Sequence, residues 1–197
     1  MDTTNFRGFN QLVSIVRQGL SNMLAMYDKA SDWVVVRNNQ PTIQALQNDT
    51  VYFDIVSRRR YGVQGTRSVK DGNGNWRQES IWYEELLIQV SAFRQRNPET
   101  DTEETLTSGD VIEFLQACVN SNPDMGLEVN GVGSPRSFFE ASGVQVIRST
   151  EVRELDYETD SGLKEKLPQF DFLLVVEQRF LKNIGKIDTI EITTKRI

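Results

Sequence analysis

The most informative absence in this 197-residue sequence is histidine, of which there is none. Histidine is the commonest general base and metal ligand, so its absence removes the usual centre of an acid–base or metal-dependent site. There is one cysteine, Cys118, which excludes a disulfide framework and favours reducing surroundings. The sequence therefore points away from the commonest catalytic sites and from folds held together by disulfides.

Long apolar runs and net positive charge are also missing. No run approaches about 18 apolar residues, so we expect no membrane-spanning segment. The first residues do not place a basic stretch before an apolar one, so we expect no secretory signal. A net charge of −6 opposes binding to nucleic acid or anionic membrane, because phosphates are held mainly by lysine and arginine. The length and composition fit a single globular domain over residues 1–197.

The periodicity of apolar residues predicts two helices. Over residues 6–27 these residues recur at helical spacing and form one stripe along about five turns. Gly19 lies within the stripe, where it leaves room for a close packing contact. The second helix is predicted to begin at Thr107 or Ser108, either of which can cap it, and to end at Asn120. Its apolar face includes the cysteine, which we therefore expect to be buried.

The other regular segments are predicted to be strands. Residues 51–95 hold two β-rich runs around the turn sequence at residues 71–75, which predicts a long antiparallel hairpin whose tip, residues 62–78, projects beyond the sheet. Shorter strands are predicted at residues 33–36, 144–152, 170–176 and 187–194, with an acidic turn from Glu154 to Gly162. This order predicts an α+β fold: a single mostly antiparallel sheet with the long N-terminal helix and the second helix packed on one face.

Two segments of opposite charge stand out. Residues 57–78 carry a local charge of +5, because one aspartate opposes six basic residues: Arg58, Arg59, Arg60, Arg67, Lys70 and Arg77. Residues 97–113 carry −6 and no basic residue. Opposite charges on one chain suit a contact between two copies, since a head-to-tail contact needs two different complementary surfaces. We therefore predict that the basic hairpin faces acidic residues of a neighbouring subunit or partner, among them Asp101, Glu103 and Glu104.

No enzymatic motif is visible. Nucleophile-elbow, zinc-protease, paired-cysteine and phosphate-loop patterns are all missing from the sequence. Carboxylate clusters such as Glu84-Glu85 are compatible with Mg²⁺, so a metal-dependent nuclease stands as an alternative, with Asp156 and Lys164-Glu165-Lys166 as its nearest candidate. We predict that the lysine-flanked segment lies on a turn and not on a strand. We expect neither an enzyme nor a cofactor.

Several short segments follow one another in a recognisable order. They are the N-terminal helix, the Asn39-Gln40-Pro41 turn, the Val51-Tyr52-Phe53 strand and the long hairpin, followed by Val152-Arg153-Glu154-Leu155-Asp156 and Pro168-Gln169-Phe170-Asp171-Phe172. This order resembles that of the tail terminator (neck terminator) proteins of long-tailed bacteriophages. The resemblance covers most of the chain.

What the resemblance implies is a virion structural protein, assembled in the host cytoplasm, that forms a homo-oligomeric ring of six-fold symmetry. Such a ring caps the tail tube, ends the polymerisation of the tail tube protein and joins the tail to the neck or connector protein. Genomic DNA passes through without specific binding, and no membrane is involved. A monomeric adaptor module is the remaining alternative, although a monomer has no use for two complementary charged surfaces.

Overall fold

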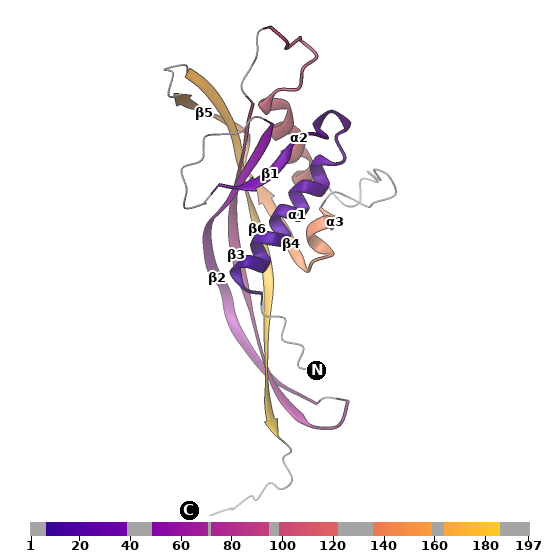
Figure 1. The fold of residues 1–197 in the computed structure, drawn as a ribbon. Helices are drawn as coiled ribbons and strands as arrows, with labels where there is room; N and C mark the ends of the chain where they lie inside the picture. Colours follow the sequence, from indigo (N-terminus) through magenta and orange to yellow (C-terminus); the bar gives the residue numbers. More distant parts are fainter. Residues whose placement is uncertain are drawn as a thin grey trace, which may run out of the picture.

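The computed structural model describes residues 7–38, 49–70, 72–94, 99–121, 136–158 and 164–185. They form a six-stranded sheet with helices packed on one face (Figure 1). In chain order the elements are α1 (Phe9–Leu24), a 3-10 turn η1 (Asp28–Ala30), β1 (Val34–Arg37), β2 (Thr50–Lys70), β3 (Trp76–Phe93), α2 (Ser108–Asn120), α3 (Ser137–Glu140), β4 (Val144–Ser149), β5 (Arg153–Glu158) and β6 (Lys164–Gly185). The predicted α+β fold is confirmed. The predicted strand at residues 187–194 and the turn at residues 39–41 lie outside the described residues.

The long strand β3 is the centre of the sheet. The strand order is β1-β2-β3-β6-β4, with β5 also paired to β6, and every pair is antiparallel except β1 with β2. The predicted hairpin is confirmed as β2 and β3, which pair from Thr50 opposite Phe93 to Lys70 opposite Trp76. Strand β6 then follows β3 along almost its whole length. The projecting hairpin is thus part of a three-stranded structure, which the sequence did not predict.

Two predictions about the last third of the chain need correction. The strand predicted at residues 170–176 is present but too short, because it is part of the longer β6. The predicted acidic turn after Glu154 is wrong, since residues 154–158 belong to strand β5, which pairs with the start of β6. The segment Lys164-Glu165-Lys166 accordingly begins a strand instead of forming a turn. These stretches are rich in charged residues, so they offered no apolar alternation from which a strand could be detected.

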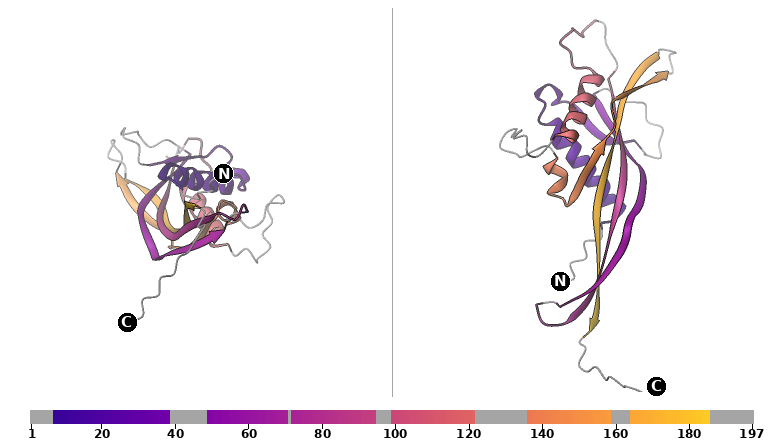
Figure 2. Two further views of the ribbon diagram at one scale, coloured as in Figure 1. Left: turned by 90° about the horizontal axis from the view of Figure 1, so that it is seen from below. Right: turned by 180° about the vertical axis from the view of Figure 1, so that it is seen from behind.

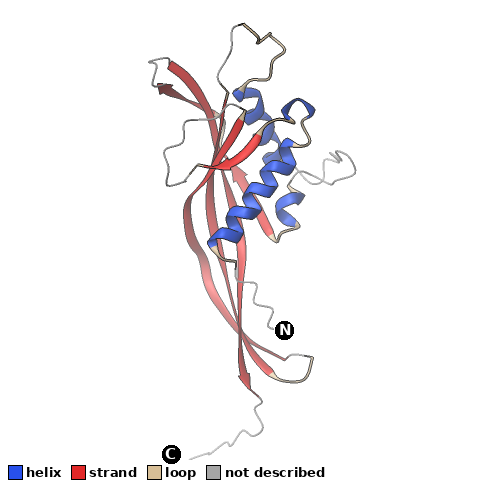
Figure 3. Cartoon of the chain, viewed as in Figure 1, coloured by secondary structure: helices blue, strands red, loops and turns tan. Residues whose placement is uncertain are grey.

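The sheet has two parts that differ in what covers them. In the first part, which we call the body, α1, α2 and α3 pack on one face of the sheet (Figures 1 and 2). In the second part, β2, β3 and β6 continue beyond the helices, with no helix alongside them in Figure 3. We call this second part the arm; it consists of residues 57–70, 76–85 and 177–185.

The core of the body is packed with aromatic rings, and α1 contacts one of them closely. The rings of Phe170 and Phe172 lie 5.9 Å apart, and the ring of Phe139 from α3 lies 5.8 Å from that of Phe172. A Cβ atom added to Gly19 would lie 2.5 Å from the Phe139 ring, so the close packing contact for which this glycine leaves room is present. Cys118 is buried as predicted, and burial raises the pKa of its thiol to about 12.

Candidate functional site

The six basic candidate residues all lie on the arm. Five of them are on β2, and Arg77 is on β3. The acidic candidates Asp101, Glu103 and Glu104 precede α2, at the opposite end of the molecule (Figures 1 and 2). The structure therefore does not bring the two charged segments together within one chain.

Three of the arginines of β2 form ion pairs with glutamates that sequence reasoning did not single out for this role. Arg58 lies 2.7 Å from Glu84, and the neighbouring pair of Arg59 with Glu85 measures 2.5 Å. Further along the arm, Arg67 lies 2.5 Å from a third glutamate of β3, Glu79. The carboxylate side chains are only 6–10% exposed, because the long arginine side chains lie over them. The local charge of +5 was counted along the sequence and left out these cross-strand partners.

The strand pleat divides the side chains of the arm between two faces. Even-numbered residues of β3 and β6 lie on the face that carries the helices in the body, which we call the helix side; odd-numbered residues lie on the outer side. On the outer side, besides the Arg59 and Arg67 pairs, Arg179 forms an ion pair with Glu177 and lies 3.4 Å from Glu79. Arg77, on the same side, also interacts with a partner. The cations of the outer side are thus engaged within the chain.

The helix side of the arm combines cations with aromatic rings. The guanidinium carbon of Arg60 lies 5.2 Å from the ring centroid of Trp82, and the amine of Lys70 lies 4.9 Å from that of Trp76. Phe180 on β6 is 49% exposed on this side. A cation over an aromatic ring keeps its charge accessible while the ring orients it. Aromatic and basic residues are therefore interleaved in space here, although they are not interleaved along the sequence.

A buried polar cluster marks the junction of the arm with the body. The Gln178 side chain is fully buried; its Oε1 accepts from the Arg7 backbone N–H at 2.8 Å, and its amide nitrogen donates to Glu84 at 3.0 Å. Glu84 also accepts from Trp82 at 3.3 Å and from Arg58 at 2.8 Å. Burial by itself would raise the pKa of Glu84, but the hydrogen bonds from Gln178, Arg58 and Trp82 outweigh it and lower the pKa below its ordinary value. The start of α1 is thereby fixed to the sheet where the helix cover ends.

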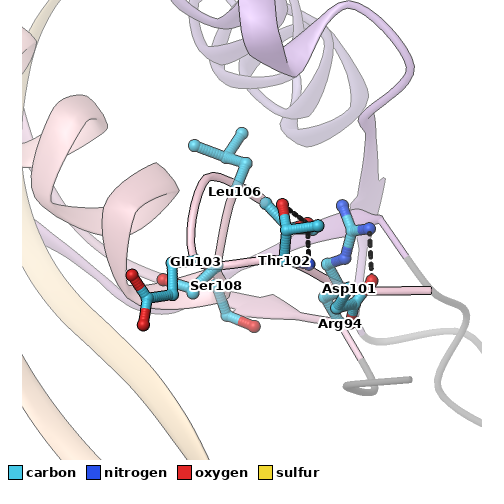
Figure 4. Close-up of a pocket in the computed structure, with 8 residues that line it drawn as sticks. Arg94, Asp101, Thr102, Glu103, Leu106 and Ser108 are labelled. Atoms are coloured by element: carbon cyan, nitrogen blue, oxygen red, sulfur yellow. Dashed lines mark hydrogen bonds and ion pairs between the residues drawn. The ribbon is translucent and has the colours of Figure 1, made fainter. Parts of the chain in front are cut away.

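The acidic candidates belong to a structured loop before α2, beside a cleft of about 270 Å³ (Figure 4). Within this loop Asp101 lies 3.5 Å from Arg94, which also contacts Asp49 at 3.3 Å. Asp101 therefore helps to fix the loop and is not free for a partner. Glu103 and Glu104 are exposed and make no ion pair with the residues that the structure describes.

The loop continues into α2 through a cap that the sequence predicted. Thr107 is the N-cap residue, and its hydroxyl oxygen accepts from the Asp110 backbone N–H at 3.2 Å. The Asp110 carboxylate accepts in return from the Thr107 backbone N–H at 2.8 Å. This reciprocal arrangement satisfies two of the free N–H groups at the helix start. The acidic loop is thus held rigidly at its helical end.

The strand pairing is compatible with the nuclease alternative, whereas the placement of the carboxylates does not support it. Asp156 of β5 faces Lys166 of β6 in the register, so an aspartate and the Lys-Glu-Lys segment lie on adjacent strands. Across the described ranges, however, no group of three or more carboxylate or cysteine side chains is placed to hold a metal ion. In the same part of the chain, none of the helices has the length and apolarity needed to cross a membrane.

Comparison with known proteins identifies the family. A search of curated proteins found no match. A family model described as "E217 gateway protein gp29" matches residues 11–186, which include every described helix and strand except the first two residues of α1. The match covers far more than half of the chain. The chain therefore belongs to the E217 gateway protein gp29 family, a family of phage virion structural proteins of the head–tail junction.

Proposed function

We propose that the protein assembles into a closed ring at the end of the phage tail, where it caps the tail tube and joins the tail to the neck. Family membership supports a structural place at the head–tail junction. The resemblance of the segment order to tail terminators supports the capping role and six-fold symmetry. The observation that carries the proposal is the separation of charge along the molecule, which gives each copy two different complementary surfaces.

This separation can be expressed as net charge. Residues 57–85 hold six basic and four acidic residues, and residues 177–185 hold two basic and one acidic, so these two segments carry +3. The whole chain carries −6, which leaves −9 on the remainder. When the cationic arm of one copy meets the acidic body of the next, the two attract each other. Charge then does not oppose the closure of several copies into a ring.

The contact we propose sets the arm of one subunit against the acidic loop of its neighbour or against the tail tube protein. Arg58, Arg59 and Arg67 pair with glutamates of the arm, and Arg77 also has a partner. Of the six basic candidates, Arg60 and Lys70 are therefore the ones without a carboxylate partner among the described residues, and we set them against Glu103 and Glu104 of the neighbour. Exposed ion pairs contribute about 0–1 kcal/mol each, so charge steers the encounter and its register. Cohesion must come from apolar or strand-edge contact. The genome passes through the ring without specific binding.

Light scattering coupled to size exclusion tests the ring. We expect a species of fixed mass that does not grow with concentration and that stops the polymerisation of tail tube protein when added to it. A monomer at all concentrations would favour the adaptor alternative, and open-ended growth would contradict closure. Asp156 and the Lys-Glu-Lys segment lie on adjacent strands, so the nuclease alternative also needs a test. Incubation of the protein with duplex DNA and Mg²⁺ provides it, and cleavage of the DNA would favour the nuclease.

A further inference from the structure

The two faces of the arm differ in the charge that remains after internal pairing. On the outer side, the described arginines are engaged by glutamates or other partners. On the helix side, Glu84 is the one carboxylate among the described residues, and Arg58 pairs with it. Arg60, Lys70 and Lys182 therefore keep their charge on the helix side without a carboxylate among the described residues.

The same side also offers apolar area next to these cations. Phe180 is 49% exposed, beside half-buried Trp82 and Trp76. Tryptophan and arginine are the residues that most often supply the binding energy of protein interfaces. In the body this face is covered by helices, but none of the described helices continues along the arm (Figure 3). Strands that lack a packed apolar face are marginally stable by themselves, so a partner on the helix side would stabilise the arm.

We propose that a second copy of this chain covers the helix side of the arm, with its carboxylates set against Arg60, Lys70 and Lys182. The proposal rests on the ring proposed above and adds to it the face of the arm that makes the contact. Charge favours this occupant, because the chain outside residues 57–85 and 177–185 carries −9, and the helix side of the arm presents three cations that pair with no carboxylate among the described residues.

A nucleic acid is the competing occupant, since cations beside aromatic rings also suit a single strand. Phosphate contacts, however, need a continuous basic track, and here three cations stand on a chain whose remainder repels a polyanion. Protein carboxylates fit better. Binding of duplex or single-stranded DNA that disappears in the Arg60→Glu, Lys70→Glu double variant would overturn the proposal.

Photo-cross-linking distinguishes the two faces directly. Benzoylphenylalanine replaces Phe180 on the helix side or Tyr61 on the outer side in the full-length protein; the two side chains have similar exposure, 49% and 55%. We expect chain-to-chain cross-links from position 180 and at least about tenfold fewer from position 61, since benzophenone reacts only with groups in contact. Equal yields, or cross-links from position 61 alone, would overturn the face assignment while the ring stands. A wild-type protein that stays monomeric would instead remove the ring itself and the inference with it.

Charge reversal provides an independent measurement with a matched control. The Arg60→Glu, Lys70→Glu double variant should associate about tenfold more slowly at low salt, with the difference shrinking as salt is added. The control makes the same change of charge at Arg17 of α1 and Arg148 of β4, both exposed and away from the arm. Equal slowing in both double variants, or wild-type rates in the arm variant, would overturn the proposal.

Discussion

The body and the arm are built from the same strands and differ in almost everything else. On the helix side of β3, Leu86 and Ile88 are fully buried in the body, whereas Ser80 and Trp82 on the same face of the arm are only half-buried. The pairing of β3 with β6 runs through both parts, with one register shift between Trp76 and Arg77. The comparison shows that backbone pairing alone continues these strands into the arm. Apolar side chains are buried on the helix side only where helices cover it.

Their stabilising forces differ accordingly. The body buries aromatic and aliphatic surface, which contributes about 25 cal/mol per Å² removed from water. The arm has cross-strand ion pairs such as Arg59 with Glu85 and cation–π contacts such as Arg60 with Trp82. Such contacts contribute about 1 kcal/mol or less each when one partner is exposed. The arm is thus held in shape by its attachment to the body, and exposed side chains such as Phe180 remain available to a partner.

The largest expected effect contrasts two phenylalanines on the same strand and the same face. Phe172 in the body is 1% exposed and Phe180 in the arm is 49% exposed. Truncation to alanine should lower the free energy of unfolding by about 3–5 kcal/mol at position 172 and by less than about 1 kcal/mol at position 180. Urea denaturation of the isolated protein measures both. A cost at position 180 that equals that at 172 would mean that the arm has a core of its own.

The second effect tests the junction between the two parts. Gln178→Ala removes the acceptor of the Arg7 backbone N–H and a donor to Glu84, and it should cost about 1–3 kcal/mol because buried polar groups lose their partners. Gln78→Ala is the matched control, since Gln78 is exposed on the same side of the arm. Thermal denaturation should separate the two variants clearly. If they melt together, the junction does not fix the start of α1.

A glycine in each part gives a third test, in which the sign of the effect changes. Gly19→Ala should destabilise by about 1–3 kcal/mol, because the new Cβ atom would lie 2.5 Å from the buried Phe139 ring. Gly65→Ala in the arm should be neutral or stabilise by up to about 1 kcal/mol, since the nearest atom would be the Ile81 carbonyl oxygen at 3.9 Å and the unfolded chain loses freedom. Chemical denaturation of both variants settles the comparison. Stabilisation by Gly19→Ala would show that the Phe139 ring yields easily.

Most of the body could be predicted from the sequence, because burial leaves a periodic pattern. The stripe of α1 and the cap of α2 at Thr107 are local signals, and both are confirmed. The length of β6 was missed, since its arm half lacks helix cover and therefore lacks an apolar face. Its pairing partner along the arm is β3, which lies about a hundred residues earlier in the chain, and no local pattern encodes that distance.

Part of the candidate site could also be predicted from the sequence. A turn centred on Asn73 places Arg67 opposite Glu79, and this is the observed register. Closer to the body, a bulge between Tyr61 and Gly65 shifts the register and brings Arg59 opposite Glu85. The sequence could therefore have predicted that glutamates of β3 face the basic residues. It could not have predicted the bulge, which decides which pairs form. Without the register, charges counted along the chain overstate the free charge of the arm.

The smallest expected effect is the pH dependence that Glu84 gives to the junction. Its pKa in the folded protein is lowered, because hydrogen bonds from Gln178, Arg58 and Trp82 to the ionised carboxylate outweigh burial, which acts in the opposite direction. A carboxyl group with a lowered folded pKa stabilises the fold above its unfolded pKa of about 4.3, and this contribution is lost as the pH falls through the folded pKa.

In Glu84→Gln the amide cannot ionise, so the difference in unfolding free energy between wild type and variant should be largest at neutral pH and should shrink on acidification. Urea denaturation of both proteins from about pH 7 to pH 3 measures that difference. A gap that stays constant would mean that burial cancels the effect of the hydrogen bonds on the pKa of Glu84, and a gap that widens at low pH would mean that burial prevails.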